Sequence, residues 1–406
     1  VLSGSGRTTG MDVPVSERAR LAVVVWSVLV SQTFLYPGLE DLIVALGAPG
    51  DIQAGMWFLV AEFAAFITCA VVWGALSDAS GRRTPWIVLG ALGGAGCYVS
   101  LTLFPSLGLG FDAVLAVRVL GGALTIGAFS LSITMLMDLS ASHGRNMGAA
   151  GIAIGLGAAL GSVVGGQLST VNPLAPLLAS AAVLALAAGV VATVPDRAVG
   201  SARRATGLLT RLRARRRLAI PYAFGFVDRM TAGFFSLVGV FYFREAFGLD
   251  AGAVGLTLAL FFVPFALLQY PFGSWSDRIG RFLPVVGGSI AYGLGIVAVG
   301  LAPVYPLAAV LMVVVGVFGA LVSPTTMALV SDLADPEESG TAMGGFNVFG
   351  SLGFLSGFLV GGVAADVWGY LPAFVLVGGL ELAIAVVAAP AVRSIEFDAG
   401  AIEAVQ

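Results

Sequence analysis

The amino-acid sequence predicts an all-α membrane protein with twelve transmembrane helices in two pseudo-symmetric six-helix bundles. Three observations support this prediction: an apolar composition, twelve long apolar segments, and a polar loop motif that occurs twice, half a chain apart. Hydrophobic residues make up 58% of the 406 residues, charged residues only 11%, and the mean hydropathy is +0.99. A water-exposed surface needs far more charge, so the composition excludes a soluble globular protein.

The apolar segments are each long enough to cross a bilayer as a helix, which takes about 20 residues. They cover residues 20–46, 53–73, 85–104, 112–136, 147–170, 174–194, 218–246, 253–272, 283–302, 306–330, 341–364 and 371–391. We therefore expect an N-terminal bundle at 20–195 and a C-terminal bundle at 218–392. An arginine-rich linker at 196–217 joins them, and residues 1–19 and 393–406 form tails.

The distribution of positive charge predicts the orientation. All 20 positive charges are arginines, and 17 of them fall in the tails, the linker or loops on the same side of the membrane. Arg244 alone falls on the opposite side, and Arg118 and Arg229 lie within spans. By the positive-inside rule we expect both tails and the linker to be cytoplasmic, in a multi-pass protein of the cell (cytoplasmic) membrane. The linker arginines then face anionic lipid headgroups, and no nucleic-acid partner is expected.

The duplicated loop motif follows the second and eighth segments. Residues 74–83 are Gly-Ala-Leu-Ser-Asp-Ala-Ser-Gly-Arg-Arg, and residues 273–281 are Gly-Ser-Trp-Ser-Asp-Arg-Ile-Gly-Arg. Both copies contain Gly-x-x-Ser-Asp-x-x-Gly-Arg, with Asp78 and Asp277 199 residues apart. We expect a cytoplasmic gate formed by the motif residues and two further recurring acids. These are Gly74, Asp78, Gly81, Arg82 and Asp138 in the first half, and Gly273, Asp277, Gly280, Arg281 and Asp332 in the second.

Each residue type in the motif has a physical use at a gate. Gly74 permits close backbone contact with the other half, Asp78 can cap a helix start, and Arg82 can pair with Asp138. Such a latch would hold the cytoplasmic side shut. The alternative is that the motif only forms a turn and supplies the positive charge expected on the cytoplasmic side. The presence of two matching copies favours the latch.

A glycine array also recurs. The fifth segment carries Gly148, Gly157, Gly161, Gly165 and Gly166, and the eleventh carries Gly344, Gly353, Gly357, Gly361 and Gly362, each 196 residues later. Small residues at this spacing let membrane helices approach closely. We expect Gly157, Gly161, Gly165, Gly353, Gly357 and Gly361 to serve helix packing.

Together these motifs resemble the major facilitator superfamily over essentially the whole chain. The twin loops are similar to the family's loop signature, and Arg118-Val-Leu-Gly121-Gly122 partly matches its fourth-span signature. The glycine array is most similar to that of the twelve-span drug/metabolite proton antiporters, with Ser162 where a proline is usual. The resemblance implies two bundles that rock around a central cavity. It also implies that spans 1, 4, 7 and 10 line the cavity while 3, 6, 9 and 12 face lipid.

Ionisable residues within spans are costly and are therefore candidates for function. Glu62, in the second span, has no partner on its own helix and suits a proton carrier; the alternative is a protonated acid bound to a neighbouring helix. Arg118 either steers substrate or lowers the proton affinity of a nearby carboxylate. Asp228 and Arg229 point about 100° apart. Either Asp228 titrates protons next to a cavity or to Arg118, or the charges form a structural ion pair that locks the seventh span.

Four other residues complete the list considered from sequence. Gln32 and Tyr36 lie one turn apart on the first span and, with Glu62, Arg118, Asp228 and Arg229, form the predicted substrate and proton-coupling set. Glu381 lies in the last span, where a dimer contact, a hydrogen-bonded neutral acid and a register error are all open. His143 is expected to be a solvated loop residue.

The sequence thus predicts a secondary active transporter that works by alternating access. The leading hypothesis is proton-coupled antiport, the efflux of a small amphipathic or hydrophobic compound, because charge in the spans is sparse and aromatic residues are abundant. The alternatives are a symporter or uniporter for an organic anion or other metabolite, and a non-transporting membrane partner protein with the same fold. We expect a monomer with no cofactor or metal, and no enzyme, because no nucleophile–base set, metal cluster or phosphate loop is present.

Overall fold

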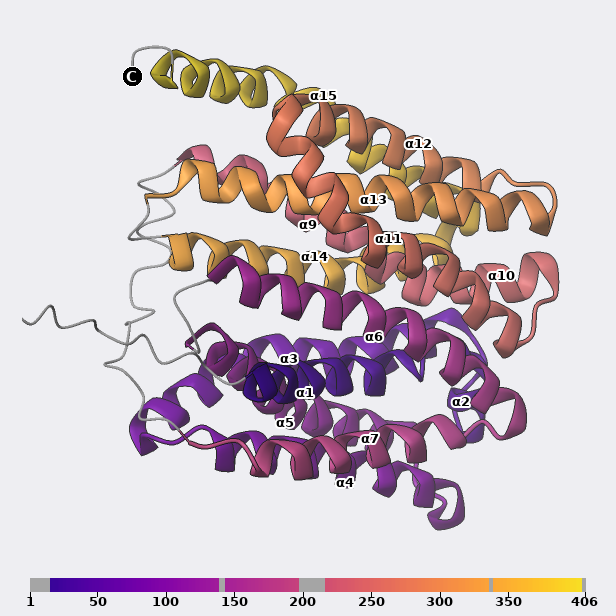
Figure 1. The fold of residues 1–406 in the computed structure, drawn as a ribbon. Helices are drawn as coiled ribbons and strands as arrows, with labels where there is room; N and C mark the ends of the chain where they lie inside the picture. The colour runs from indigo at the N-terminus through magenta and orange to yellow at the C-terminus, as the bar shows by residue number, and fades with distance from the viewer. Residues whose placement is uncertain (1–14, 139–142, 197–215, 336–338, 404–406) are drawn as a thin grey trace, which may run out of the picture.

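The computed structural model describes residues 15–138, 143–196, 216–335 and 339–403, with side chains for 17–136, 154–196, 217–335 and 339–395. Every regular element in these ranges is helical (Figure 1). Most of the predicted linker and the outermost parts of both predicted tails lie outside the described residues. The side chains of Asp138 and His143 also lie outside them.

The N-terminal half contains six spans, the first of which is broken into two helices. The helices are α1 (Val15–Thr33), α2 (Leu39–Ala45), α3 (Ile52–Ser80), α4 (Thr84–Leu107), α5 (Phe111–Asp138), α6 (His143–Val171) and α7 (Ala175–Ala192). The break at 34–38 contains Pro37, whose ring cannot continue a helix.

The C-terminal half repeats this order. After the 3₁₀ turn η1 (Arg216–Leu218), its elements are α9 (Ala219–Phe234), the π-helical turn η2 (Phe235–Gly239), α10 (Val240–Phe247), α11 (Ala251–Ile279), the π-helical turn η3 (Leu283–Gly287), α12 (Gly288–Gly300), α13 (Tyr305–Leu333), α14 (Ser339–Trp368) and α15 (Tyr370–Glu403). The irregular turn η2 lies where the first half has its break, so the first span of each half is interrupted at the same level.

Eleven helical stretches among the described residues are long and apolar enough to cross a membrane. The remaining span is the first one. Its helix α1 carries the charged residues Glu17, Arg18 and Arg20 near its start, and the break separates α1 from the seven-residue helix α2. Neither helix alone is therefore both long and apolar enough. The twelve predicted spans are therefore all helical, and the prediction of an all-α fold with two six-helix bundles is confirmed.

The second and eighth spans show how closely the halves correspond. Helices α3 and α11 are both 29 residues long. Asp51 and Asp250, 199 residues apart, each cap the helix start by accepting a 2.8 Å hydrogen bond from the amide three residues on. Gly81 and Gly280 each follow the helix end with a positive φ, of 64° and 89°, which favours glycine. The duplicated motif thus places a glycine with a positive φ after both helices, although only Gly81 adopts the left-handed helical conformation.

The glycine array packs α6 on α1 and α14 on α9. A Cβ atom at Gly165 would lie 2.3 Å from the Phe34 carbonyl oxygen, and one at Gly357 would lie 2.2 Å from that of Met230. The other predicted packing glycines, Gly157, Gly161, Gly353 and Gly361, also face α1 or α9 or the break after α1. These six glycines therefore join helices within each half.

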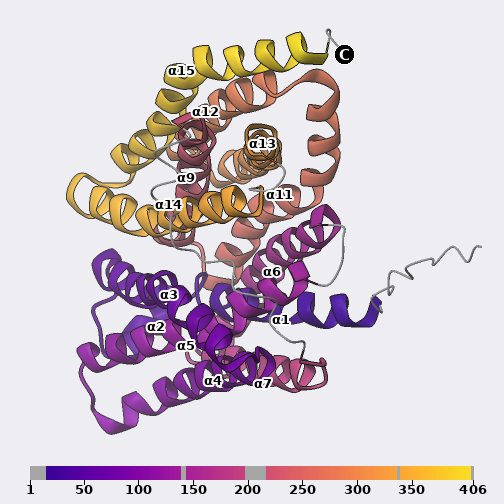
Figure 2. The same cartoon turned by 90° about the vertical axis from the view of Figure 1, so that its left-hand side faces the viewer.

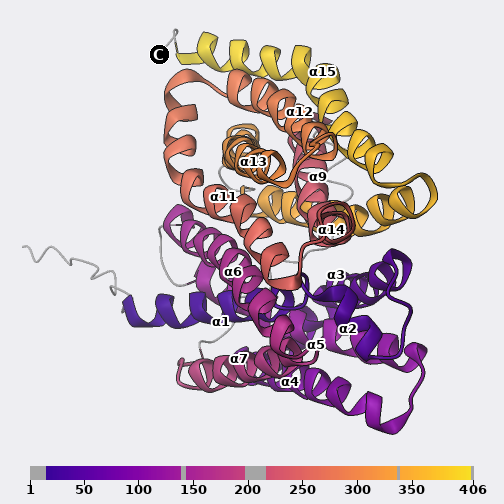
Figure 3. The ribbon, with the colours of Figure 1, turned by 90° about the vertical axis from the view of Figure 1, so that its right-hand side faces the viewer.

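Different pairs of helices join the two halves. Figures 2 and 3 show the N-terminal half below the C-terminal half, with α6 against α11 and α3 against α14. A Cβ atom at Gly166 would lie 2.5 Å from the Ala251 carbonyl oxygen, and one at Gly255 would lie 2.3 Å from that of Ser162. Helices α4 and α7, and likewise α12 and α15, lie on the sides remote from the other half.

We call the end of the bundles that holds the starts of α1 and α9 and the end of α7 the terminal end. It carries both copies of the loop motif. The opposite end carries the connections at residues 46–51, 108–110, 248–250 and 301–304.

Candidate functional site

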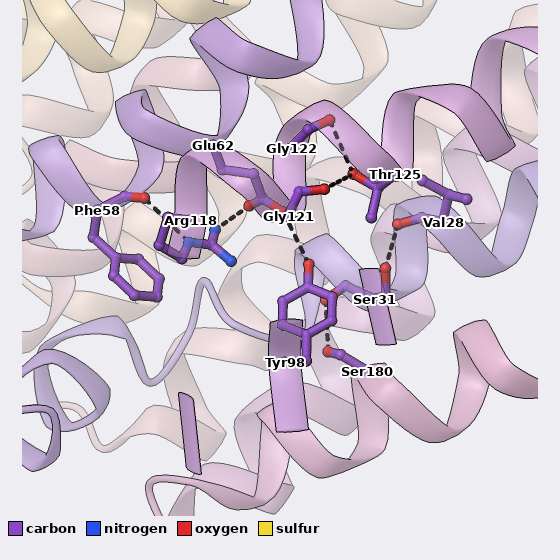
Figure 4. Close-up of polar contacts among 10 residues, drawn as sticks. All are labelled: Val28, Ser31, Phe58, Glu62, Tyr98, Arg118, Gly121, Gly122, Thr125 and Ser180. Atoms are coloured by element: carbon purple, nitrogen blue, oxygen red, sulfur yellow. Dashed lines mark hydrogen bonds and ion pairs between the residues drawn. The ribbon is translucent and has the colours of Figure 1, made fainter. Parts of the chain in front are cut away.

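The charged centre of the N-terminal half is a buried ion pair between α3 and α5. An Arg118 Nη2 group contacts Glu62 Oε2, and the Tyr98 hydroxyl donates a 3.0 Å hydrogen bond to Glu62 Oε1 (Figure 4). Arg118 is 2% exposed and Glu62 is 5% exposed. Burying one such charge alone costs several kcal/mol, so each residue depends on the other.

Arg118 is fully occupied by α3. Its Nε donates a 3.3 Å hydrogen bond to the Phe58 carbonyl oxygen, and its guanidinium lies 4.1 Å from the centre of the Phe58 ring. A cation above an aromatic face is stabilised by the ring's electron density. Of the two roles expected for Arg118, the geometry fits control of a carboxylate, because little of its guanidinium is free to meet a substrate.

Close backbone packing brings Glu62 and Arg118 together. A Cβ atom at Gly122 would lie 2.0 Å from the Glu62 carbonyl oxygen, so only glycine permits this approach of α5 to α3. Trp73 on α3 donates a 2.6 Å hydrogen bond to the Ala123 carbonyl oxygen. The sequence analysis missed both Tyr98 and this role of Gly122. A signal for Tyr98 exists, because Gly93-Gly94-x-x-x-Tyr98 recurs as Gly287-Gly288-x-x-x-Tyr292.

Tyr36 lies near this centre, but Gln32 and Tyr36 are not on one helix as expected. Helix α1 ends at Thr33, so Tyr36 belongs to the break before α2. Tyr36 is 5% exposed and lies within electrostatic reach of Glu62 and Arg118. Gln32 is buried, and its Nε2 has no hydrogen-bond partner among the described residues.

A cluster of aromatic rings next to Glu62 joins the two halves. Phe63 on α3 lies 4.9 Å from Phe354 and 5.9 Å from Phe358 on α14, measured between ring centres. The Tyr36 ring lies 6.4 Å from Phe358, and the Phe66 ring lies 5.5 Å from Phe63. A movement of α3 at Glu62 therefore reaches the other half directly.

Asp228 and Arg229 lie in the other half and do not meet Arg118. Asp228 is 3% exposed, and its Oδ1 has no hydrogen-bond partner among the described residues. The expectation that Asp228 titrates beside Arg118 is wrong, because Arg118 is engaged with Glu62 on α3. Arg229 is partly exposed, and its side chain packs against Gly350 on α14.

Glu381 points into the C-terminal bundle. It is fully buried, and a Cβ atom at Gly293 of α12 would lie 3.1 Å from Glu381 Cβ. The suggestion that this residue forms a dimer contact is therefore wrong, although α15 itself lies on the outside of its half.

At the terminal end, the second copy of the loop motif forms an ionic cluster. Arg281 donates hydrogen bonds of 2.6 Å to Asp277 Oδ1 and 2.9 Å to Asp332 Oδ2. Burial disfavours the charged form of Arg281, but hydrogen bonds to the two carboxylates hold its pKa above the ordinary value. The loop thus pairs with the end of α13 in its own half, and the gate role of Asp277, Arg281 and Asp332 stays a prediction.

The first copy differs from expectation at two positions. Asp78 lies in the last turns of α3 and does not cap the next helix; Asp196 does, by accepting hydrogen bonds of 3.0 and 3.4 Å from the amides of Arg83 and Thr84. Asp78 still lies within α3, whereas the next helix, α4, begins only at Thr84. A Cβ atom at Gly74 would meet open space, so the close contact expected there is not made in this conformation. The pairing of Arg82 with Asp138 lies outside the described side chains.

The opposite end carries an ion pair between the halves that the sequence analysis missed. Arg244 on α10 donates hydrogen bonds of 2.7 and 2.8 Å to the two carboxylate oxygens of Asp41 on α2. Its Nε lies 2.7 Å from Glu40 Oε2. The only arginine predicted on that side thus joins the two bundles there. We call Glu40, Asp41 and Arg244 the opposite-end clamp.

Duplicated helical bundles, irregular first spans and buried charges beside the contact between the halves define a membrane transporter of the two-bundle type. The model of the Major Facilitator Superfamily matches residues 21–243 and 218–402, so the chain belongs to this family. It is therefore a multi-pass membrane transporter of small molecules and not an enzyme.

Relatives in sequence cover part of the chain. An uncharacterized MFS-type transporter of Methanocaldococcus jannaschii is 29% identical over 151 residues, which are 36% of this chain and 39% of that protein. The multidrug resistance protein MdtG of Proteus mirabilis is 31% identical over 121 residues, which are 30% of each chain. The matched region thus spans well under half the length of these curated relatives.

Solved structures share the fold over nearly the whole chain. A bacterial homologue of the human lysosomal transporter Spinster, solved in an inward-facing and unoccupied conformation, has a TM-score of 0.77 at 13% identity, covering 94% of this chain and 97% of that chain. The human organic anion transporter MFSD10 has a TM-score of 0.66 at 23% identity, covering 92% and 99%.

Proposed function

We propose that this transporter exports a small amphipathic or hydrophobic compound in exchange for protons, and that Glu62 takes up the proton. The buried ion pair of Glu62 with Arg118, next to the rings that join the halves, is the observation that carries the proposal. The relationship to the multidrug resistance protein MdtG over 30% of the chain supports efflux as the direction. The arginine distribution supports cytoplasmic tails in a cell membrane. The chain acts as a monomer.

The chemistry of the ion pair makes it a two-state element. Glu62 accepts hydrogen bonds from both an arginine and a tyrosine hydroxyl. Protonation removes the charge and leaves Arg118 buried without a counter-ion, which costs several kcal/mol. The contact between α3 and α5 must then rearrange, and Phe63 passes this movement to Phe354 and Phe358 of α14.

The conformation fits one stage of this cycle. The opposite-end clamp holds the halves together on the side predicted to face outside. With cytoplasmic tails, this is a state closed to the outside, and the similar Spinster homologue was solved facing inward. An amphipathic solute suits the aromatic cluster of Tyr36, Phe63, Phe354 and Phe358 better than a sugar would, because few amides and acids are available there.

The test is transport in proteoliposomes. Efflux of fluorescent amphipathic dyes driven by an imposed pH gradient is expected from the wild type and is lost in Glu62→Gln, which keeps the shape but cannot exchange a proton. Asp112→Asn, at an exposed acid at the start of α5, is the control and retains transport. Full pH-driven efflux in Glu62→Gln contradicts the role of Glu62, and no dye efflux in the wild type contradicts the substrate class.

A second candidate function is symport or facilitated diffusion of an organic anion. Arg229 favours it, because this arginine is partly exposed and no acid lies within ion-pair distance of it among the described side chains. Arg118 is not expected to bind the anionic solute in this alternative, because it is paired with Glu62. Arg229→Gln separates the two functions: it abolishes saturable uptake of an anionic solute if this alternative holds, and leaves dye efflux intact if the leading proposal holds.

A further inference from the structure

The C-terminal bundle contains a second group of buried polar side chains, separate from the Glu62 ion pair. The group comprises Asp228 on α9, Ser289 and Tyr292 on α12, and Glu381 on α15. Asp228 is 3% exposed and the other three are fully buried. Five oxygen atoms in the group have no hydrogen-bond partner among the described residues: Asp228 Oδ1, Ser289 Oγ, Tyr292 Oη and both carboxyl oxygens of Glu381. Buried polar atoms normally have hydrogen-bond partners, so a group of five without one is unusual.

Close helix packing brings these side chains to one place. A Cβ atom at Gly293 would lie 2.6 Å from the Gly378 carbonyl oxygen, so α12 and α15 touch at their backbones beside Glu381. Ser289, one turn before Gly293, lies next to the Glu381 carboxyl. The Tyr292 hydroxyl lies within electrostatic reach of both Asp228 and Glu381. Ser289 and Tyr292 thus lie in the same buried region of the C-terminal bundle as Asp228 and Glu381.

The charge balance of this space is acidic. Helix α9 contributes Asp228 and the adjacent Arg229, α12 contributes the titratable Tyr292, and α15 contributes Glu381. Helices α13 and α14 contribute no ionisable side chain at this depth; α13 places Ser323 beside Asp228. Arg229 can balance the neighbouring Asp228 but is not among the groups that act on Glu381.

Two carboxylates so placed cannot both be ionised, because like charges in an apolar interior repel strongly and neither is hydrated. We propose that Asp228 and Glu381 form a two-carboxyl site that holds one proton inside the C-terminal bundle. The proton resides on Glu381, since Arg229 stabilises the negative charge of Asp228. The Ser289 and Tyr292 hydroxyls are the nearest groups that can accept a hydrogen bond from the protonated acid.

This site is distinct from the proton role of Glu62, because it belongs to the other half and involves none of the same helices. It is linked to the contact between α9 and α14 through Arg229, whose side chain packs against Gly350. A change in the contact between α9 and α14 is expected to change how strongly Arg229 stabilises the negative charge of Asp228. It would thereby change which of the two acids holds the proton.

Infrared spectroscopy of the purified full-length protein tests the proposal without substrate or a transport assay. The wild type at neutral pH is expected to show the carbonyl-stretch band of a protonated carboxylic acid that resists exchange with heavy water. Glu381→Gln removes this band. Tyr292→Phe keeps it but shifts its frequency, because a polar hydroxyl within electrostatic reach of the acid is removed. Asp112→Asn and Glu62→Gln leave it unchanged.

Two outcomes overturn the proposal. A wild type without the band, or a band that persists in Glu381→Gln, shows that Glu381 does not hold the proton. Sodium ions that raise the unfolding temperature of the wild type at constant pH, but not that of Glu381→Gln, show that the occupant is a metal cation. Because Glu62→Gln is included, loss of the proposed coupling at Glu62 and loss of this site are measured separately.

Discussion

The two halves have the same backbone packing at matching positions but different side chains there. In the N-terminal half a Cβ atom at Gly122 would lie 2.0 Å from the Glu62 carbonyl oxygen; in the C-terminal half a Cβ atom at Gly316 would lie 2.3 Å from that of Phe261. Gly122 and Gly316 are 194 residues apart in the sequence, and Glu62 and Phe261 are 199 residues apart. Other repeated features of the chain have the same two separations. Glu62 and Phe261 are therefore equivalent positions of a duplicated fold.

The ionic side chains have no counterpart. Met312, fully buried, stands where the first half has Arg118, and only the tyrosines Tyr98 and Tyr292 match in type. The second half instead carries its acids on α9 and α15. The difference leads us to expect that the glycine contacts bring these helices together in both halves without help from the charges, which then serve something other than folding. The following predictions test this division.

The largest effect is expected from removing one member of the N-terminal ion pair. Arg118→Met alone leaves Glu62 buried without a counter-ion and lowers the free energy of unfolding by about 3–5 kcal/mol. The double variant Glu62→Phe with Arg118→Met copies the second half and recovers most of that stability while transport stays absent. Reversible unfolding in mixed micelles gives the stabilities. A double variant as unstable as the single one means that the charges are needed for folding.

Tyr98→Phe should cost more than Tyr292→Phe. Tyr98 donates to an ionised carboxylate, and a hydrogen bond to a charged group contributes about 1.5–3 kcal/mol. Tyr292 has no hydrogen-bond partner of its own among the described residues, so its hydroxyl contributes less to stability. The same unfolding measurement compares the two variants. Equal losses contradict the assignment of the ionic centre to the first half.

Gly122→Ala and Gly316→Ala should be equally destabilising. Each added methyl group would overlap a backbone carbonyl oxygen, and overpacking of this kind costs about 1–3 kcal/mol. Gly74→Ala is the matched control, because a Cβ atom there meets open space. Unequal losses at Gly122 and Gly316 would show that the two contacts are not equivalent.

The smallest effect on stability is expected at the opposite-end clamp, which joins the halves rather than belonging to either. Glu40 and Asp41 are about a third exposed, and exposed ion pairs contribute about 0.2–1 kcal/mol. Arg244→Gln should therefore barely change unfolding but widen the distance distribution between spin labels placed on α2 and α10. An unchanged distribution contradicts the role of these residues as a clamp.

Much of the fold follows from sequence, because helix length and glycine spacing are local properties. The twelve spans, the loop copies and the packing glycines could each be recognised from short segments. Partners across helices could not: Glu62 meets Arg118 because Gly122 fixes how α5 lies on α3, and that rotation is a tertiary property. The inward direction of Glu381 was missed for the same reason, since the position of α15 in the bundle does not determine which way each of its side chains points.

The interruptions of the first span in each half have a mechanical consequence. The segments beyond them, α2 and α10, are only seven and eight residues long, and they carry Asp41 and Arg244. A helix break at a proline and a π-helical turn are both places where a helix bends more easily than elsewhere. We therefore expect the two short segments to move while the long helices stay in place, so that the opposite-end clamp opens before the bulk of either bundle has moved.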